Sequence, residues 1–188
     1  MSVPARPGYT LAEVLLVLTL LGLLLVLAAP VLDTVGYRMN NAVHEVGGEL
    51  AAAQRLAVVR GHDIVVAFDT SRRAVRIHDD RDNDRRVGPG EPLRWVALPA
   101  GVRFGRGAAP PHPWLGPEAV GWTKRQDGLP AVVFHRSGSA SEMGGFYLVS
   151  ERGARERRPQ DARAVVIDRA TGRVSVWRFT GSRWEVEL

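Results

Sequence analysis

One stretch decides the fold, GYTLAEVLLVLTLLGLLLVLAAPVL, which runs from Gly8 to Leu32. Its last nineteen residues, Val14 to Leu32, carry no charge, and a helix of about twenty apolar residues can cross the core of a bilayer. Glu13 stands directly before this run. A carboxylate inside an apolar span costs about 3 kcal/mol even on mild insertion scales, so Glu13 needs a reason of its own. The stretch therefore predicts a membrane-spanning helix with a functional acidic residue at its start.

The residues around Glu13 resemble the processing site of type IV prepilins and type II secretion pseudopilins. Gly8, Tyr9 and Glu13 match the cleavage glycine, the first mature residue and the assembly glutamate, and Pro30 falls where such spans commonly carry proline. The resemblance implies that a prepilin peptidase cuts between Gly8 and Tyr9 and N-methylates Tyr9. It also implies that Glu13 pairs with the Tyr9 amine of a neighbouring subunit. An ordinary signal peptide, with its shorter apolar core, fits less well.

The composition limits what the rest of the chain can be. The chain has 188 residues, a net charge of +5 and no cysteine, which excludes disulfides and cysteine-based metal sites. Of its 25 basic residues all but Lys124 are arginine, an excess that leaves nucleic acid or anionic lipid open as partners. The amino terminus and Arg6 favour a cytoplasmic N-terminus, with the domain after the span in the periplasm.

A second helical pattern follows the apolar run. Apolar residues recur at spacings of three and four until Gly61, which predicts one buried stripe on a helix. The stripe consists of Met39, Val43, Val46, Leu50, Ala53 and Ala57. We expect one helix from about Thr10 to Arg60, with Pro30 as a place for a kink. The expected divisions are a leader at 1–8, a membrane-spanning half-helix at 9–32, an amphipathic half-helix at 33–61 and a β-rich domain at 62–188.

Runs of β-branched and aromatic residues predict strands in that domain. The expected strands are residues 63–68, 74–78, 94–98, 102–104, 131–134, 145–149, 164–167, 174–179 and 184–188. Residues 105–128 show no period and predict a long irregular loop, of a length that is usually functional or mobile. A long helix followed by strands predicts an α+β, pilin-like fold, in which the helix packs on an antiparallel β-sheet.

The second half of the chain resembles the C-terminal domain of the GspH/FimT group of minor pseudopilins. The likeness lies in Val133-Phe134-x-x-x-Gly138, in the strand 164–167 and in Thr171-Gly172-Arg173-Val174. It implies a non-enzymatic subunit of the type II secretion pseudopilus, held in the inner membrane. Its implied partners are other pseudopilins, the prepilin peptidase and the inner-membrane assembly platform. The alternative is a type IV pilus minor pilin that binds DNA for uptake or supports pilus assembly.

The segment from Asp80 to Glu91 is a candidate calcium loop, and no other cofactor is expected. Counted from Asp80, the acidic residues Asp80, Asp82, Asp84 and Glu91 fall at places 1, 3, 5 and 12, the ligand spacing of an EF-hand. Arg85 stands where that loop requires glycine, and a strand precedes it instead of a helix. The spacing predicts weak calcium binding at most. The alternative is a solvated hairpin tip in which aspartates and arginines satisfy each other.

The C-terminal arginines are candidates for DNA contact, chiefly Arg173 and Arg178. Some members of the group bind DNA through a Gly-Arg-x-Arg element, but here Ser175 replaces its second arginine. Acidic residues are interspersed among these arginines, and a basic surface without dense one-sided charge is usually only soluble surface. DNA binding is therefore expected to be weak. The five histidines show no metal-ligand spacing, and no catalytic residue is expected.

Overall fold

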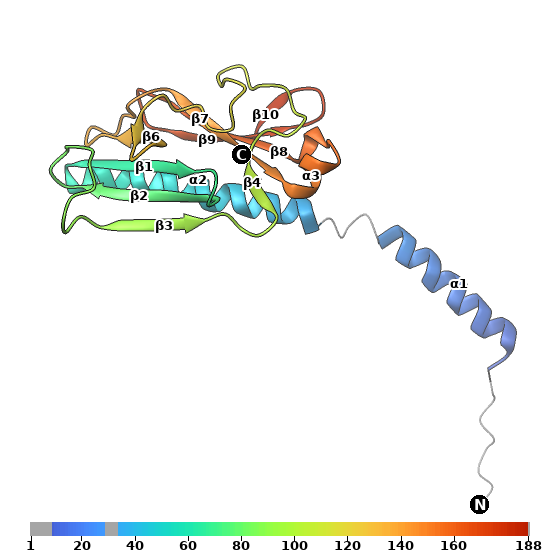
Figure 1. Cartoon of the computed structure of the whole chain (residues 1–188). Coiled ribbons are helices and arrows are strands. Elements are labelled where there is room, and N and C mark those ends of the chain that lie inside the picture. Colours follow the sequence, from blue (N-terminus) through green and yellow to red (C-terminus); the bar gives the residue numbers. More distant parts are fainter. Residues whose placement is uncertain (1–8, 29–33, 188) are drawn as a thin grey trace, which may run out of the picture. The chain divides into compact units, whose positions relative to one another are not determined.

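The computed structural model describes residues 9–28 and 34–187 of the chain. These residues fall into two compact units, Met1–Thr34 and Val35–Leu188 (Figure 1). The first unit contains α1 (Leu11–Ala28), and the second contains α2 (Thr34–Arg60) from its second residue on, followed by the strands. The expected continuity of one helix through Pro30 concerns residues outside those described and stays a prediction. Within the described ranges, no helix combines the length and the apolarity of a candidate membrane span.

The second unit contains two five-stranded antiparallel sheets. The first has the order β3-β2-β1-β6-β5. Its strands are β1 (Asp63–Asp69), β2 (Ala74–Asp80), β3 (Leu93–Ala97), β5 (Arg125–Gln126) and β6 (Leu129–Phe134). The second has the order β10-β9-β8-β7-β4. Its strands are β4 (Val102–Phe104), β7 (Gly144–Ser150), β8 (Ala162–Ile167), β9 (Val174–Phe179) and β10 (Trp184–Glu187). The α+β class is confirmed, but the strands form two sheets where the sequence predicted one.

Helix α2 supplies the centre of the core. All six residues of the predicted stripe are at most 2% exposed, so that prediction is confirmed. They pack in one apolar cluster with inward-facing residues of both sheets, such as Val66 of β1 and Val165 of β8. The amphipathic pattern therefore works as a core surface, because a sheet needs an apolar layer to cover it.

Polar contacts fasten α2 to both sheets. The Arg163 guanidinium on β8 donates to Asn40 Oδ1 over 2.7 Å, and Arg94 on β3 is paired with Glu49. The hydrogen bond from Arg94 lowers the pKa of the Glu49 carboxyl. The helix ends at Gly61, whose φ of +73° suits a left-handed C-terminal cap and whose N–H donates to the Ala57 carbonyl over 3.0 Å.

The 105–128 segment is irregular, as predicted, but it is packed against the second sheet. Ala109, Leu115 and Trp122 are at most 8% exposed. A Cβ at Gly144 would come within 2.5 Å of the Trp122 indole, so the bare glycine backbone of β7 allows the ring to lie against it. The segment also ends in β5, which the sequence analysis missed. Two further short elements were missed, α3 (Glu151–Arg155) and the 3₁₀ turn η2 (Pro159–Asp161).

Candidate functional site

The start of α1 is a capping box. The N–H of Glu13 donates to Thr10 Oγ1 over 3.2 Å, and the Thr10 N–H donates to Glu13 Oε2 over 3.4 Å. Such a reciprocal Thr-x-x-Glu pair satisfies two N–H groups that the helix itself leaves free. Glu13 therefore has a local structural role in addition to the expected role in assembly. The sequence analysis missed Thr10, although the spacing signals it.

The other residues of the expected processing site are less fully described. The Tyr9 side chain is 85% exposed beside the capping box. Gly8 and Pro30, named from the resemblance, lie outside the described residues. Their expected roles remain predictions.

Beyond the cap, α1 is apolar on all sides. The large apolar side chains from Val14 to Leu24 each expose between 47% and 61% of their surface within this unit. A helix that is apolar all round is normally buried in lipid or inside a larger assembly. This helix therefore requires apolar surroundings that its own unit does not provide.

The acidic loop after β2 brings three of its four predicted ligands together. One carboxylate oxygen from each of Asp80, Asp82 and Asp84 lies within 4.8 Å of the others. Asp80 is fully buried at the end of β2, whereas Asp82 and Asp84 are exposed. Burial raises the pKa of the Asp80 carboxyl.

Glu91, the fourth predicted ligand, is directed elsewhere. Its Oε2 accepts from the Gly88 N–H over 2.7 Å and lies 2.9 Å from His78 Nε2, while Oε1 accepts from the Arg81 N–H over 2.8 Å. These contacts, the Gly88 N–H above all, lower the pKa of the Glu91 carboxyl from 4.5 to about 2. Glu91 thus braces the loop, and its carboxylate is not among the three that lie within 4.8 Å of one another.

We expect Glu91→Gln to lower the free energy of unfolding by about 2 kcal/mol at neutral pH, because hydrogen bonds to a charged acceptor are replaced by weaker ones. A carboxyl whose folded pKa is depressed stabilises the fold above its unfolded pKa, and this stabilisation is lost as the pH falls through the folded pKa. The difference between the two proteins should therefore shrink as the pH falls from 4.5 toward 2. Urea unfolding of the full chain in detergent at several pH values measures this difference in the free energy of unfolding.

Glu118→Gln is the matched control, since Glu118 is an exposed carboxylate on the 105–128 segment. It should leave stability within about 0.5 kcal/mol of the wild type at each pH. A stability gap for Glu91→Gln that stays constant on acidification would contradict the assigned role.

Arg173 and Arg178, the predicted DNA contacts, are both exposed but do not converge. Arg173 directly precedes β9 and Arg178 lies near its end. Positions five apart along an extended chain are separated by roughly 17 Å. They do not form one surface for a phosphate backbone.

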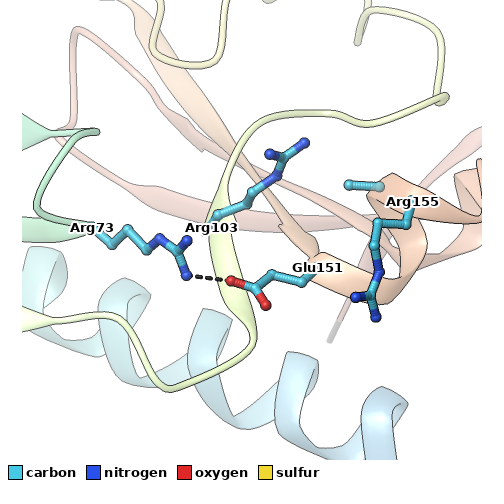
Figure 2. Close-up of a pocket in the computed structure, with 5 residues that line it drawn as sticks. Arg73, Arg103, Glu151 and Arg155 are labelled. Carbon is cyan, nitrogen blue, oxygen red and sulfur yellow. Dashed lines mark hydrogen bonds and ion pairs between the residues drawn. The ribbon is translucent and has the colours of Figure 1, made fainter.

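A different group of arginines does converge, around Glu151 of α3. Arg73, Arg103 and Arg155 line a cavity of about 270 Å³ with Glu151, and Figure 2 shows Arg73 directed at that carboxylate. Arg73 is ion-paired with Glu151, whereas Arg103 and Arg155 have no ion-pair partner in the described part of the chain. An adjacent cavity adds Arg38 of α2. This Arg73–Arg155 cluster carries excess positive charge that the sequence analysis missed, because its members are far apart in the chain.

The 105–128 segment also forms one wall of an aromatic cavity of about 350 Å³. Trp114 of the segment, Trp177 of β9 and Trp184 of β10 line it. The Trp184 indole N–H donates to the Pro110 carbonyl over 3.2 Å, and the His112 N–H donates to the Tyr147 hydroxyl over 2.8 Å. These bonds hold the segment on the sheet, where it covers apolar surface.

An apolar α1 with a capped start and a second helix packed on antiparallel sheets define the pilin-like class of proteins. The family model described as type II transport protein GspH matches residues 42–172, well over half of the chain. The chain therefore belongs to the GspH family of type II transport proteins. This confirms the resemblance to the GspH/FimT group that the sequence analysis identified.

Two solved structures are similar to the chain, and both are of the minor pseudopilin EpsH from the type II secretion system of Vibrio cholerae. One has a TM-score of 0.47 and 13% sequence identity, and covers 75% of this chain and 97% of that one. The other has a TM-score of 0.46 and 15% identity, and covers 76% of this chain and 95% of that one. No curated protein sequence matches. The family assignment rests on the family model.

Proposed function

We propose that the chain works as a minor pseudopilin, a structural subunit of the type II secretion pseudopilus and not an enzyme. The observation that carries this proposal is the GspH family match over residues 42–172, which covers most of α2, the whole first sheet and strands β4, β7 and β8 of the second sheet. The apolar α1, whose exposed side chains need a partner, supports a role in assembly.

The subunit is made as a precursor with a leader at residues 1–8, which a prepilin peptidase removes before it N-methylates Tyr9. Residues 9–32 anchor it in the inner membrane, with the N-terminus in the cytoplasm. The amphipathic half-helix at 33–61 and the domain at 62–188 lie in the periplasm. The uncharged run supports this arrangement, because it continues beyond the described end of α1 to Leu32.

In the filament, Glu13 pairs with the Tyr9 amine of a neighbouring subunit, and other pseudopilins and the assembly platform are the partners. The capping box leaves room for this pairing. It engages Oε2 of Glu13, and Oε1 has no hydrogen bond within the described residues, so it can accept from an ammonium. In apolar surroundings an unpaired charge is costly, so a subunit docked out of register is disfavoured.

Deletion of the gene tests the proposal against its alternative. We expect type II secretion to fall severalfold in the deletion strain and to recover when the wild-type chain is supplied. DNA uptake and twitching should be unchanged, since the subunit belongs to the secretion filament. Secreted enzyme activity in the medium and transformation frequency are the two measurements.

Loss of uptake with normal secretion would instead favour the DNA-binding minor pilin. In that event two double variants show which surface binds duplex DNA, Arg103→Gln with Arg155→Gln and Arg173→Gln with Arg178→Gln. They remove equal charge from two different places, since Arg103 lies on the edge strand β4 and lines one cavity with Arg155 of α3, whereas Arg173 directly precedes β9 and Arg178 lies near its end. Binding through general electrostatics would fade steeply between low and physiological salt.

A further inference from the structure

The three aspartates after β2 lie close enough together to hold one cation. Oxygens that bind the same Ca²⁺ lie about 2.3–2.6 Å from it, so no two of them are more than about 5 Å apart. The three carboxylate oxygens of Asp80, Asp82 and Asp84 lie within 4.8 Å of one another and meet that limit. All three could therefore contact a single ion.

A second observation concerns Asp80 alone. Its side chain is fully buried, and its Oδ1 is a buried oxygen with no hydrogen-bond partner among the described residues. The other oxygen, Oδ2, accepts from the Arg85 N–H over 3.0 Å. A buried carboxylate oxygen without a partner loses its hydration and gains nothing in return. A cation bound by the cluster would restore that lost interaction.

The arginines of the loop do not neutralise this cluster. Arg81 lies 3.8 Å from a different carboxylate, Asp79. Within the described residues, the guanidinium groups of Arg85 and Arg86 make no ion pair with Asp80, Asp82 or Asp84. Their backbone N–H groups donate to Asp80 and Asp84 instead. Arginines and aspartates of the described loop therefore meet through backbone hydrogen bonds, and no arginine forms an ion pair with Asp80, Asp82 or Asp84.

We propose that Asp80, Asp82 and Asp84 form a weak calcium site at the end of β2, a function separate from filament assembly. Calcium fits because it takes six to eight oxygen ligands in flexible geometry, and water can complete the set around three carboxylates. Glu91 is not a ligand, because its two oxygens are engaged with His78, Gly88 and Arg81. The revised site differs from the sequence prediction in this one residue.

Arg85 limits the affinity. It takes the place that is glycine in an EF-hand, and its φ is +64°, a conformation that glycine adopts without strain. Its guanidinium also adds positive charge to the loop. We expect a dissociation constant of about 10⁻⁴–10⁻³ M, typical of weak extracellular calcium modules, and roughly tenfold tighter binding for Arg85→Gly.

Titration of the full chain in detergent micelles with calcium chloride, followed by calorimetry, tests the site. Asp82→Asn and Asp84→Asn should each weaken binding about tenfold or more, because each removes one ligand charge from an exposed position and keeps an amide oxygen that can accept the loop's backbone hydrogen bond. Glu118→Gln, which removes one exposed carboxylate elsewhere, should bind as the wild type does. Calcium should also raise the melting temperature of the wild type and of Glu118→Gln more than that of the two aspartate variants.

Absence of binding at several millimolar calcium would overturn the proposal. So would an affinity that Asp82→Asn and Asp84→Asn leave unchanged, or magnesium binding as tight as calcium binding. None of these outcomes bears on secretion by the deletion strain, so the calcium site and the pseudopilin role can fail separately.

Discussion

Gly8→Val is expected to leave nearly all of the protein as the full-length precursor. The proposed peptidase cuts the bond between Gly8 and Tyr9. A side chain at residue 8 would obstruct the approach of this bond to the active site of the peptidase. Membrane insertion should continue, because the nineteen uncharged residues of the span are unchanged. Intact mass spectrometry of the membrane fraction distinguishes a chain that begins at Met1 from one that begins at a methylated Tyr9.

Gly8→Ala provides a graded control, since a methyl group should slow cleavage less than the branched side chain of valine. Full cleavage of Gly8→Val would remove the assigned role of Gly8. A wild-type chain that is itself never cleaved would contradict the whole processing account.

Glu13→Gln is expected to be inserted, cleaved and methylated, and yet to be almost absent from filaments. Glutamine can replace glutamate in a capping box, so the start of α1 is preserved. The charge is lost, and the Tyr9 amine of a neighbour then has no carboxylate to meet in apolar surroundings. Recovery of the variant in sheared or cross-linked filaments, relative to its amount in the membrane, is the measurement.

Thr10→Val separates the two roles of Glu13. This change removes the hydroxyl that accepts from the Glu13 N–H and should weaken the helix start by about 1 kcal/mol, but it keeps the carboxylate. It should therefore enter filaments. Normal recovery of Glu13→Gln would disprove the pairing, and equal loss of both variants would show that assembly requires the cap as well as the charge.

The elements with strong local patterns were predictable from the sequence. The stripe on α2 was predicted residue by residue, because a helix that covers a sheet must repeat its apolar positions every three to four residues. The main strands were predicted from their runs of β-branched and aromatic residues. The division into two sheets was not, because sheet membership depends on pairing between distant segments, such as β4 with β7, which no local period records.

The candidate sites show the same limit. The spacing of Asp80, Asp82 and Asp84 was informative, since neighbouring residues of one loop stay neighbours in space. Glu91 was grouped with them because counting along the chain cannot show that its carboxylate faces His78 and the Gly88 N–H. The grouping of Arg73, Arg103 and Arg155 could not be predicted, because these residues are far apart in the sequence and meet only when three separate segments fold together.

The position of α2 has a consequence for how the protein folds during its synthesis. The helix leaves the ribosome before every strand that covers it. The hydrogen bond between Asn40 and Arg163 forms only after a further 123 residues have been synthesised. Contacts between such distant residues are slow to form, because the closing of a long loop costs entropy before the contact repays it. The apolar stripe of α2 thus stays uncovered until most of the domain has emerged, and uncovered apolar surface of this kind makes a nascent chain prone to aggregate during that interval.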